Sequence, residues 1–357
     1  RDLQWVMFIV LRDSTGKLQV TIEKSNEDNK KLLEIMSNVT VESTIKVTGI
    51  LNENEKVKLN GMELIPDDIE VTSLCDGIIP VNYKTPENVN LDTRLDYRFL
   101  DLRSDKNILM FKIESTLVQY MREYLYNNNF TEIHTPKLIG AASESGSEVF
   151  EVKYFDRKAY LAQSPQFYKQ MAIAGGFDRV FEVAPCFRAE DSNTSRHSTE
   201  FTSFDVEFAH IDSFEDVMNL ESEMITYAFK KVKELYDDEI EKVFGSKIII
   251  PKMPFPRMKL KDVYDELEKR YGYKVSDEEK NDMTTEAEKL SYKLAQDKFD
   301  SEFLFITEYP AEKRAFYHMR NEKGILQGYD LIWRGVEITS GAQREHRYNE
   351  IVKNAKE

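Results

Sequence analysis

Charged side chains that suit a polyanion are concentrated in one segment, residues 187–208. The segment resembles a strand, a charged loop and a second strand, which predicts a hairpin. This hairpin would gather five charged side chains around one pocket: Arg188, Glu190, Arg196, His197 and Asp205. Arginine binds phosphate oxygens through paired hydrogen bonds, and nearby carboxylates suit a metal ion carried with the phosphates. The alternative is a surface hairpin crossed by salt bridges.

Alternation along the second strand predicts a polar face and an aromatic face. Ser203, Asp205 and Glu207 would share the polar face. Phe204, Val206 and Phe208 would share the opposite face. The polar face can line a site while the aromatic face anchors the strand in a core.

These residues resemble motif 2 of the class II aminoacyl-tRNA synthetases, most closely that of the aspartyl enzymes of the archaeal and eukaryotic type. Four further segments are similar to the same family in the same order. They are Phe130–Pro136, similar to motif 1; Ser143–Ser147, similar to the mobile loop over the amino acid; Gln163–Gln170, similar to the aspartate-selecting segment; and Arg334–Arg344, similar to the strand before motif 3. Five similar segments in the same order as in the family argue against a chance resemblance.

The resemblance implies a reaction in which the carboxylate of an amino acid attacks the α-phosphorus of ATP, with no protein nucleophile. The enzyme then has to align the reactants and offset developing charge. By resemblance, Arg188 and Glu337 are the catalytic residues, and Arg188 holds both the α-phosphate and the carboxylate. The other expected ATP contacts are Glu190 and Phe201 on adenine, Arg196 and His197 on the outer phosphates, and Glu337.

The resemblance also implies that Asp330 and Glu337 hold Mg²⁺, an ion that prefers oxygen ligands. A spacing of seven residues would place them on opposite faces of one regular strand. We therefore expect a bulge at Gly335 to bring them together. The alternative is a strand with solvated acids.

Substrate choice is expected to rest on charge. By resemblance, Lys169 and Arg344 pair with the side-chain carboxylate of aspartate, and Asp205 and Glu144 take its ammonium group. The remaining expected aspartate contacts are Ser164, Gln166 and Ser340. Asparagine would leave the two cations uncompensated, and the related asparaginyl enzymes lack a lysine at the position of Lys169.

The expected fold class is α+β, with an N-terminal OB-fold β-barrel followed by a class II synthetase catalytic domain built on an antiparallel β-sheet flanked by helices. A chain of 357 residues exceeds a typical single domain. We expect an OB-fold anticodon-binding domain at 1–76 with an incomplete first strand, a hinge at 77–104 and the catalytic domain at 105–357.

The barrel is predicted from strands at 5–13, 17–24 and 43–52, a helix at 26–38 and closing strands at 56–74. Phe8, Gln19 and Glu63 match the family's anticodon contacts: Phe8 would stack on a base, and the other two would read base edges. The alternatives are a core role for Phe8 and solvated side chains for Gln19 and Glu63.

In the catalytic domain, apolar residues at helical spacing predict a helix from Asp105 to about residue 127. Pro136 is expected to end a short strand, and in the family this helix and strand form a homodimer interface. Strands near 148–156, 158–163, 179–188 and 201–209 fit one antiparallel sheet, followed by helices at 214–237 and 260–271. Residues 210–323 carry no catalytic signature and are expected to pack on the sheet or to form a modest insertion.

Composition indicates a cytoplasmic protein, because only two cysteines are present and neither a signal peptide nor a membrane-spanning run is found. The net charge of -15 neither supports nor excludes a tRNA partner, because phosphate contacts depend on local clusters of Lys and Arg.

The expected function is aspartate–tRNA ligase, with tRNA-Asp as acceptor and tRNA-Asn left open as a second one. Motif 3 is not found after Arg344, so we expect a chain truncated at both ends and inactive by itself. The alternatives are a catalytically inactive, synthetase-like tRNA-binding protein and an asparaginyl-tRNA synthetase. An asparagine-forming enzyme on the same catalytic fold is disfavoured by the OB-fold, which it would not need.

Overall fold

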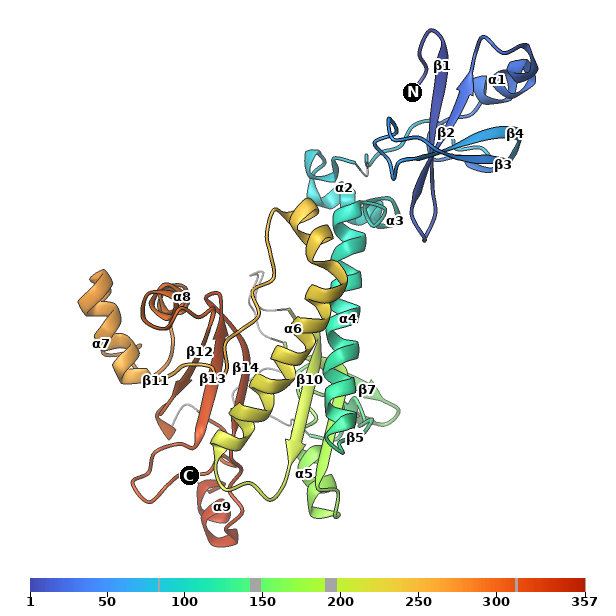
Figure 1. Cartoon of the computed structure of the whole chain (residues 1–357). Helices are drawn as coiled ribbons and strands as arrows, with labels where there is room; N and C mark the ends of the chain where they lie inside the picture. The colour runs from blue at the N-terminus through green and yellow to red at the C-terminus, as the bar shows by residue number, and fades with distance from the viewer. Residues whose placement is uncertain (83, 142–148, 190–197, 312–313, 357) are drawn as a thin grey trace. The chain divides into compact units, whose positions relative to one another are not determined.

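The computed structural model describes residues 1–82, 84–141, 149–189, 198–311 and 314–356 (Figure 1). The chain forms two compact units, Arg1–Asp105 and Lys106–Glu357, each with its own core. The exact domain boundaries predicted above stay a prediction.

The first unit contains a four-stranded sheet in the order β1-β2-β4-β3. Its strands are β1 (Val6–Arg12), β2 (Lys17–Glu23), β3 (Thr44–Glu53) and β4 (Met62–Ser73); a 3₁₀ turn, η1 (Glu27–Asn29), and helix α1 (Lys30–Ser37) lie between β2 and β3. Ile22, Leu32 and Ile69 form its buried centre. This confirms the predicted order of strands, helix and strands.

The end of the barrel sequence differs from the expectation, because residues 56–61 form a turn and not a strand. Asn60 and Gly61 have φ angles of 61° and 63°, and the Asn54 N–H donates to the Gly61 carbonyl at 2.8 Å. One strand, β4, therefore closes the sheet. A bulge on β4 at Asp67 faces Gly49 of β3, because Thr48 pairs with Asp68 and Gly49 pairs with Pro66. A Cβ atom at Gly49 would lie 2.1 Å from the Ile65 carbonyl oxygen, so only glycine permits this close approach.

The predicted hinge is partly helical and clusters with the barrel. It contains η2 (Pro86–Asn88), α2 (Leu91–Asp96) and α3 (Arg98–Asp101). The buried Asp101 carboxylate accepts hydrogen bonds from Arg94 and Arg98. Arg103 in turn pairs with Glu42 of the barrel.

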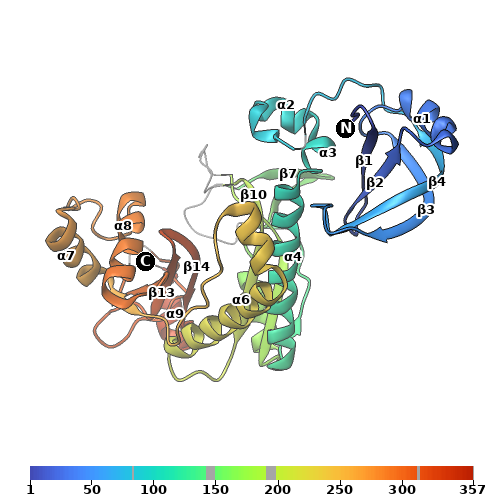
Figure 2. The same cartoon turned by 45° about the horizontal axis from the view of Figure 1, so that its top comes forward.

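In the second unit, two long helices lie side by side, α4 (Asp105–Asn127) and α6 (Phe214–Phe244) (Figures 1 and 2). Leu109 of α4 packs with Val232 and Ile240 of α6. Helix α6 begins at a capping box formed by Ser213 and Asp216, and it runs seven residues past the predicted end at 237.

The prediction that four strands form one antiparallel sheet is wrong, because the structure divides them between two sheets. Strand β9 (Arg179–Phe187) pairs with β10 (Glu200–Phe208) and with β5 (Thr131–Glu132). Strand β8 (Arg157–Leu161) pairs instead with β7 (Glu151–Tyr154) and β6 (Leu138–Ile139). Strand β7 pairs with β8 and strand β9 with β10 as two antiparallel hairpins. Alternation within either hairpin did not reveal that the two belong to different sheets.

Pro136 does not end a strand, because β5 stops four residues earlier at Glu132. The Thr135 N–H and hydroxyl both donate to the Glu182 carboxylate, at 2.7 and 2.8 Å. These donors are thereby removed from any strand ladder. Lys137 completes the cluster through a 3.0 Å ion pair with Glu182.

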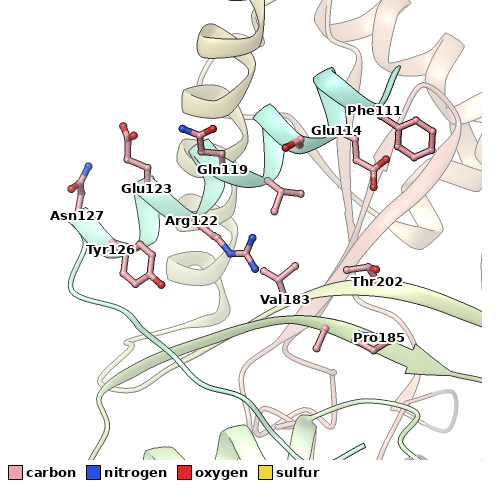
Figure 3. A pocket seen from close by; sticks show the side chains of 13 residues that line it. Phe111, Glu114, Gln119, Arg122, Glu123, Tyr126, Asn127, Val183, Pro185 and Thr202 are labelled. Atoms are coloured by element: carbon pink, nitrogen blue, oxygen red, sulfur yellow. The ribbon is translucent and has the colours of Figure 1, made fainter. Parts of the chain in front are cut away.

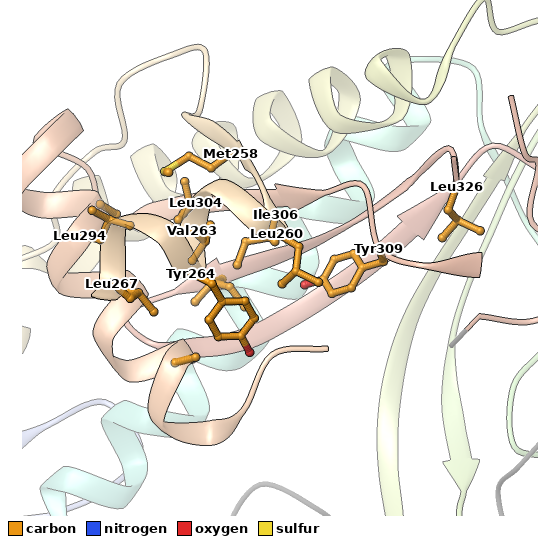
Figure 4. Packing of buried hydrophobic residues seen from close by; sticks show 13 residues of the cluster. Met258, Leu260, Val263, Tyr264, Leu267, Leu294, Leu304, Ile306, Tyr309 and Leu326 are labelled. Carbon is orange, nitrogen blue, oxygen red and sulfur yellow. The ribbon is translucent and has the colours of Figure 1, made fainter. Parts of the chain in front are cut away.

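A third sheet of the second unit has four strands, in the order β11-β12-β13-β14. Its strands are β11 (Arg257–Lys259), β12 (Phe303–Thr307), β13 (Gly328–Trp333) and β14 (Val336–Ala342). Helix α6 covers one face, and α7 (Leu260–Tyr271) with α8 (Thr285–Phe299) covers the other (Figures 1 and 4). Residues 210–323 therefore build much of this layer, and β11 and β12 belong to the sheet itself and not to an insertion.

Candidate active site

The hairpin of β9 and β10 presents the polar face that alternation predicts. Its other face buries Phe204, Val206 and Phe208 against Phe181. On the polar face the Arg188 guanidinium carbon lies 5.2 Å from the centre of the Phe201 ring, and the Arg188 N–H donates to the Thr199 carbonyl. Two of the predicted ATP contacts, Arg188 and Phe201, are therefore neighbours.

Four other predicted site residues lie outside the described residues. They are Glu144, in the segment expected to be the mobile loop, and Glu190, Arg196 and His197, which lie between β9 and β10 in the sequence. Their roles stay predictions.

Helix α5 (Gln166–Ala174) places Gln166 and Lys169 on one buried face, because residues three apart are neighbours on a helix. The Ser164 hydroxyl accepts the Gln166 N–H at 3.2 Å at the start of this helix. The Lys169 ammonium donates to Asp205 at 3.0 Å and lies 3.7 Å from Glu207. The helix therefore carries its lysine directly to the polar face of β10.

Arg344, which follows β14, reaches the same cluster from the other sheet. Its Nη2 donates to Gln166 Oε1 at 2.9 Å, and its Nε lies 3.5 Å from Glu207 Oε1. The structure therefore brings together four predicted aspartate contacts from three segments distant in the sequence, Gln166, Lys169, Asp205 and Arg344. Glu207, which sequence reasoning placed only on the polar face, lies between the two cations.

The cluster is balanced in charge, with two cations and two carboxylates in contact. Burial by itself would raise the pKa of Asp205, but the Lys169 ammonium and a hydrogen bond from Ser203 hold that pKa below its usual value. An amino acid with both an ammonium and a side-chain carboxylate can exchange partners with these four groups without leaving a buried charge unpaired.

Asp330 and Glu337 also come together, but by a different route from the one expected. They lie on two strands, β13 and β14, joined by a turn at Arg334 and Gly335, whose φ angles are 49° and 80°. Gly335 is thus part of the hairpin turn and not of a bulge.

The bulge lies at Ile338, because Leu331 pairs with Thr339 and Ile332 pairs with Glu337. This extra residue resets the alternation of β14 and places Glu337 on the same face as Asp330. Ser340, a predicted aspartate contact, pairs directly with Asp330 and shares that face.

The two carboxylates show the electrostatics of a site that suits a cation. Burial raises the pKa of Asp330 although the Arg314 guanidinium, 2.5 Å away, opposes the shift. Glu337 keeps contact with solvent, yet the protein atoms around it and the nearby Asp330 carboxylate raise its pKa to about 8. Asp330 Oδ1 is buried without a hydrogen-bond partner among the described residues.

These observations fit Mg²⁺ better than an all-protein metal cage. Within the described part of the chain, no group of three or more His, Cys, Asp or Glu side chains could hold a metal ion. Mg²⁺ commonly takes one or two carboxylates and completes its shell with water and phosphate oxygens. Asp330 and Glu337 supply that number of ligands.

A buried carboxyl group lies beneath β14, between the sheet and α6. Glu221 Oε2 accepts the Tyr329 hydroxyl at 2.7 Å, and Thr339 supplies a second hydrogen bond. Burial raises the pKa of Glu221 to about 7. The Tyr329 hydroxyl occupies the space beside Gly341, where a Cβ atom would approach it to 2.4 Å. This network supports the strand that leads to Arg344.

In the first unit, the three predicted anticodon contacts share one face of the sheet. Phe8 pairs with Thr21 across β1 and β2, and Gln19 pairs with Glu63 across β2 and β4. Gln19 donates to the Thr21 hydroxyl at 3.2 Å, and Thr21 donates to Glu63. Hydrogen bonds from Thr21 and Asn54 lower the pKa of Glu63. Met7 and Ile9, on either side of Phe8, point instead to the core.

Sequence reasoning missed several residues of the second unit that lie at the site, among them Arg314, Tyr317 and His318. They come from a segment that showed no motif. The Arg344 guanidinium lies 5.1 Å from the centre of the Tyr317 ring, and Arg314 pairs with Asp330. Only the contacts of these three residues with motif residues show that they belong to the site. The one signal in the sequence was their position shortly before Asp330.

The family model described as "tRNA synthetases class II (D, K and N)" matches residues 90–357, and one described as "OB-fold nucleic acid binding domain" matches residues 1–72. A Methanopyrus kandleri protein named aspartate–tRNA(Asp/Asn) ligase is 42% identical, over 100% of this chain and 80% of that protein. The chain belongs to the aspartate–tRNA ligase family of class II synthetases. Its first unit is an OB-fold, and its second is a class II synthetase domain.

Two further comparisons show how the family divides. A Pyrococcus furiosus protein named aspartate–tRNA(Asp) ligase is 39% identical, over 100% of this chain and 81% of that protein. The crystal structure of the asparaginyl-tRNA synthetase from Pyrococcus horikoshii with asparaginyl-adenylate matches with a TM-score of 0.88 and 30% identity, covering 100% of this chain and 80% of that one. The fold is thus shared by aspartate and asparagine enzymes, and the choice between them depends on side chains. Among the described residues, no helix is both long and apolar enough to span a membrane.

Proposed function

We propose that the full-length protein activates aspartate with ATP and transfers it to tRNA-Asp. The observation that carries the proposal is the pair of cations, Lys169 and Arg344, that meet around Gln166 and Glu207. When Asp205 takes the substrate ammonium, a side-chain carboxylate together with Glu207 balances the two cations, whereas an amide leaves one positive charge uncompensated. The names of the relatives point the same way.

In this proposal the residues act by binding and orienting. Arg188 leaves the Phe201 ring to meet the α-phosphate and the reacting carboxylate, and the exposed ring becomes a surface on which adenine stacks. Asp205 takes the substrate ammonium in place of Lys169. These exchanges bring the carboxylate to the phosphorus and stabilise charge in the transition state without a protein nucleophile.

Asp330 and Glu337 would hold the Mg²⁺ that accompanies ATP. When bound, the ion neutralises charge on the phosphate oxygens. Arg314, which already pairs with Asp330, orients that carboxylate. Phe8, Gln19 and Glu63 would bind anticodon bases through stacking and hydrogen bonds. A cytoplasmic location stays the prediction made from composition.

The proposal is tested by ATP–pyrophosphate exchange with the full-length protein, comparing aspartate with asparagine. We expect strong exchange with aspartate and weak exchange with asparagine. Equal exchange with both would refute the assignment to aspartate, exchange with asparagine alone would indicate an asparaginyl enzyme, and no exchange at all would favour a binding protein. Charging of tRNA-Asp and tRNA-Asn transcripts then shows the tRNA range.

We also propose that the protein is a homodimer through the region of motif 1 around Pro136. A groove of about 840 Å³ lies between α4 and the β9–β10 hairpin, and Phe111, Arg122 and Tyr126 line it (Figure 3). Phe111 is 45% exposed and Tyr126 is 52% exposed, which is a large apolar exposure for one helix face. A second copy of the chain would cover it.

Analytical ultracentrifugation of the full-length protein tests this proposal. Phe111→Arg should convert the dimer to a monomer, because it places a charge in the apolar groove. Leu235→Arg on α6, where the leucine is 51% exposed outside the groove, is the matched control and should leave the dimer intact. A wild-type protein that sediments as a monomer at micromolar concentration would exclude this interface.

A further inference from the structure

His318 and Arg344 face each other in a short antiparallel pairing that lies outside the named strands. The flanking residues carry the hydrogen bonds: the Met319 N–H donates to Gln343 at 2.9 Å, and the Glu345 N–H donates to Tyr317 at 2.8 Å. His318 and Arg344 are therefore a non-hydrogen-bonded pair, the arrangement in which opposing side chains lie closest and on the same face. The imidazole thus lies beside the guanidinium expected to bind aspartate.

Both side chains of this pair carry a buried nitrogen that lacks a hydrogen bond to any residue the structure describes. His318 Nδ1 and Arg344 Nε have no hydrogen-bond partner within the described ranges, although Arg344 Nε lies 3.5 Å from the Glu207 carboxylate. An unsatisfied buried polar atom lowers stability, and native proteins contain few of them. Two such atoms on adjacent side chains indicate a position that a ligand completes.

The surroundings of His318 favour an anion at that position. Arg344 is on one side, and Arg314, which pairs with Asp330, also acts on the imidazole. Burial and these two guanidiniums lower the pKa of His318 to about 3. The ring is therefore neutral at physiological pH and carries one N–H. Tyr317 packs edge-on against it, with ring centres 5.1 Å apart.

We propose that His318 is a substrate-binding residue whose Nδ1–H donates a hydrogen bond to the side-chain carboxylate of the amino acid held by Arg344. One carboxylate, with its two oxygens, then satisfies both nitrogens that have no partner among the described residues. The inference rests on the proposed function, since it takes aspartate to be the amino acid. It adds a neutral donor, from a segment without a motif, to the charged pair Lys169 and Arg344.

A purely structural His318 would act through ring packing against Tyr317, and the variants separate the two roles. His318→Phe keeps a ring of similar size but removes both nitrogens. His318→Asn loses the ring but restores an N–H near the position of Nδ1. His346→Phe, two residues after Arg344 at an exposed position, is the matched control.

In ATP–pyrophosphate exchange with the full-length protein, we expect His318→Phe to raise the KM for aspartate about tenfold or more, the effect of losing one hydrogen bond to a charged group. The KM for ATP should stay within about twofold of the wild type by the same reasoning. His318→Asn should recover most of the aspartate affinity, and His346→Phe should behave as the wild type.

Thermal unfolding without ligand separates a binding role of His318 from a structural role. A structural role predicts that His318→Phe lowers the midpoint, and a binding role predicts that it does not. Because His318→Phe removes a buried nitrogen without a partner, its midpoint should equal or exceed that of the wild type, while the rise in midpoint on adding aspartate should shrink. A stability gain with a loss of affinity is the expected signature of a binding residue.

Succinate, which has both carboxylates but no ammonium group, shows whether Nδ1 contacts a carboxylate or the ammonium. Its inhibition of exchange should weaken in His318→Phe by about the same factor as aspartate binding. Unchanged succinate inhibition with weakened aspartate would place Nδ1 at the ammonium and overturn the proposal. An unchanged aspartate KM, or a joint loss of ATP and aspartate affinity with a lowered midpoint, would overturn it too. If the wild type exchanges only with asparagine, the proposed function fails first, and this inference falls with it.

Discussion

Glu221 offers a test of the buried network beneath β14. Burial raises the pKa of this carboxyl group from 4.5 to about 7, against the opposing hydrogen bonds from Thr339 and Tyr329. Between these two pH values the folded protein keeps a proton that the unfolded chain releases. The contribution of Glu221 to the free energy of unfolding should therefore be fully present below about pH 4.5. It should decrease as the pH rises to about 7.

The size of the effect follows from the shift. A rise in pKa from 4.5 to about 7 corresponds to a loss of about 3 kcal/mol across this window. Glu221→Gln removes the titration but keeps an oxygen that accepts the Tyr329 hydroxyl. We therefore expect the variant to be more stable than the wild type at pH 8, by several degrees in midpoint at about 2 to 4 °C per kcal/mol.

Thermal unfolding of the full-length protein from pH 4.5 to 8 measures this difference. The wild type should lose stability relative to Glu221→Gln as the pH rises, with the change complete near pH 8. Glu239→Gln, at an exposed position on the same helix, should remain parallel to the wild type throughout. Parallel curves for Glu221→Gln as well would refute the reasoning, because they would mean that Glu221 is already ionised in the folded protein.

Three further predictions concern the proposed sites. Lys169→Leu should reduce aspartate activation about 100-fold or more and lower the thermal midpoint, because it leaves two buried carboxylates without their ammonium partner. ATP binding, measured by equilibrium dialysis, should survive. Loss of both aspartate activation and ATP binding would make Lys169 structural. Phe8→Ala should raise the KM for tRNA about tenfold or more, and Gln19→Ala should raise it less, both with unchanged aspartate activation, since stacking on one base contributes about 1 to 3 kcal/mol; a lower midpoint with an unchanged tRNA KM would place Phe8 in the core. Asp330→Asn should abolish most of the Mg²⁺ dependence of ATP binding measured by calorimetry, and an unchanged dependence would move the metal site elsewhere.

Local patterns were reliable where one strand or helix decides the outcome. The alternation of β10 was confirmed, because each side chain of a strand faces a side determined by its own position. The order of strands and helix in the OB-fold was also confirmed, because the pattern within each segment determines its type. Helix α7 has the predicted bounds, since its apolar spacing and the glycine after it act within one segment.

Predictions that depended on pairing between segments were less accurate. Asp330 and Glu337 were expected on one strand with a bulge at Gly335, but that glycine makes the turn and the bulge lies at Ile338. The register of two strands depends on both partners, which a pattern within one of them does not contain. Pro136 likewise follows a strand already ended by the side chain of Glu182.

The sequence by itself determined the family, the order of the two domains and the identity of the charged residues, because these depend on residue types in linear order. Only the tertiary structure decided that Glu207 lies between Lys169 and Arg344. It also decided that His318 lies beside Arg344, with a nitrogen that has no hydrogen-bond partner in the described part of the chain. These contacts join α5, β10 and the segments around β13 and β14, far apart along the chain. Burial, charge compensation and hydrogen-bond satisfaction are properties of such assembled neighbours, so they arise only when the sheets and helices pack.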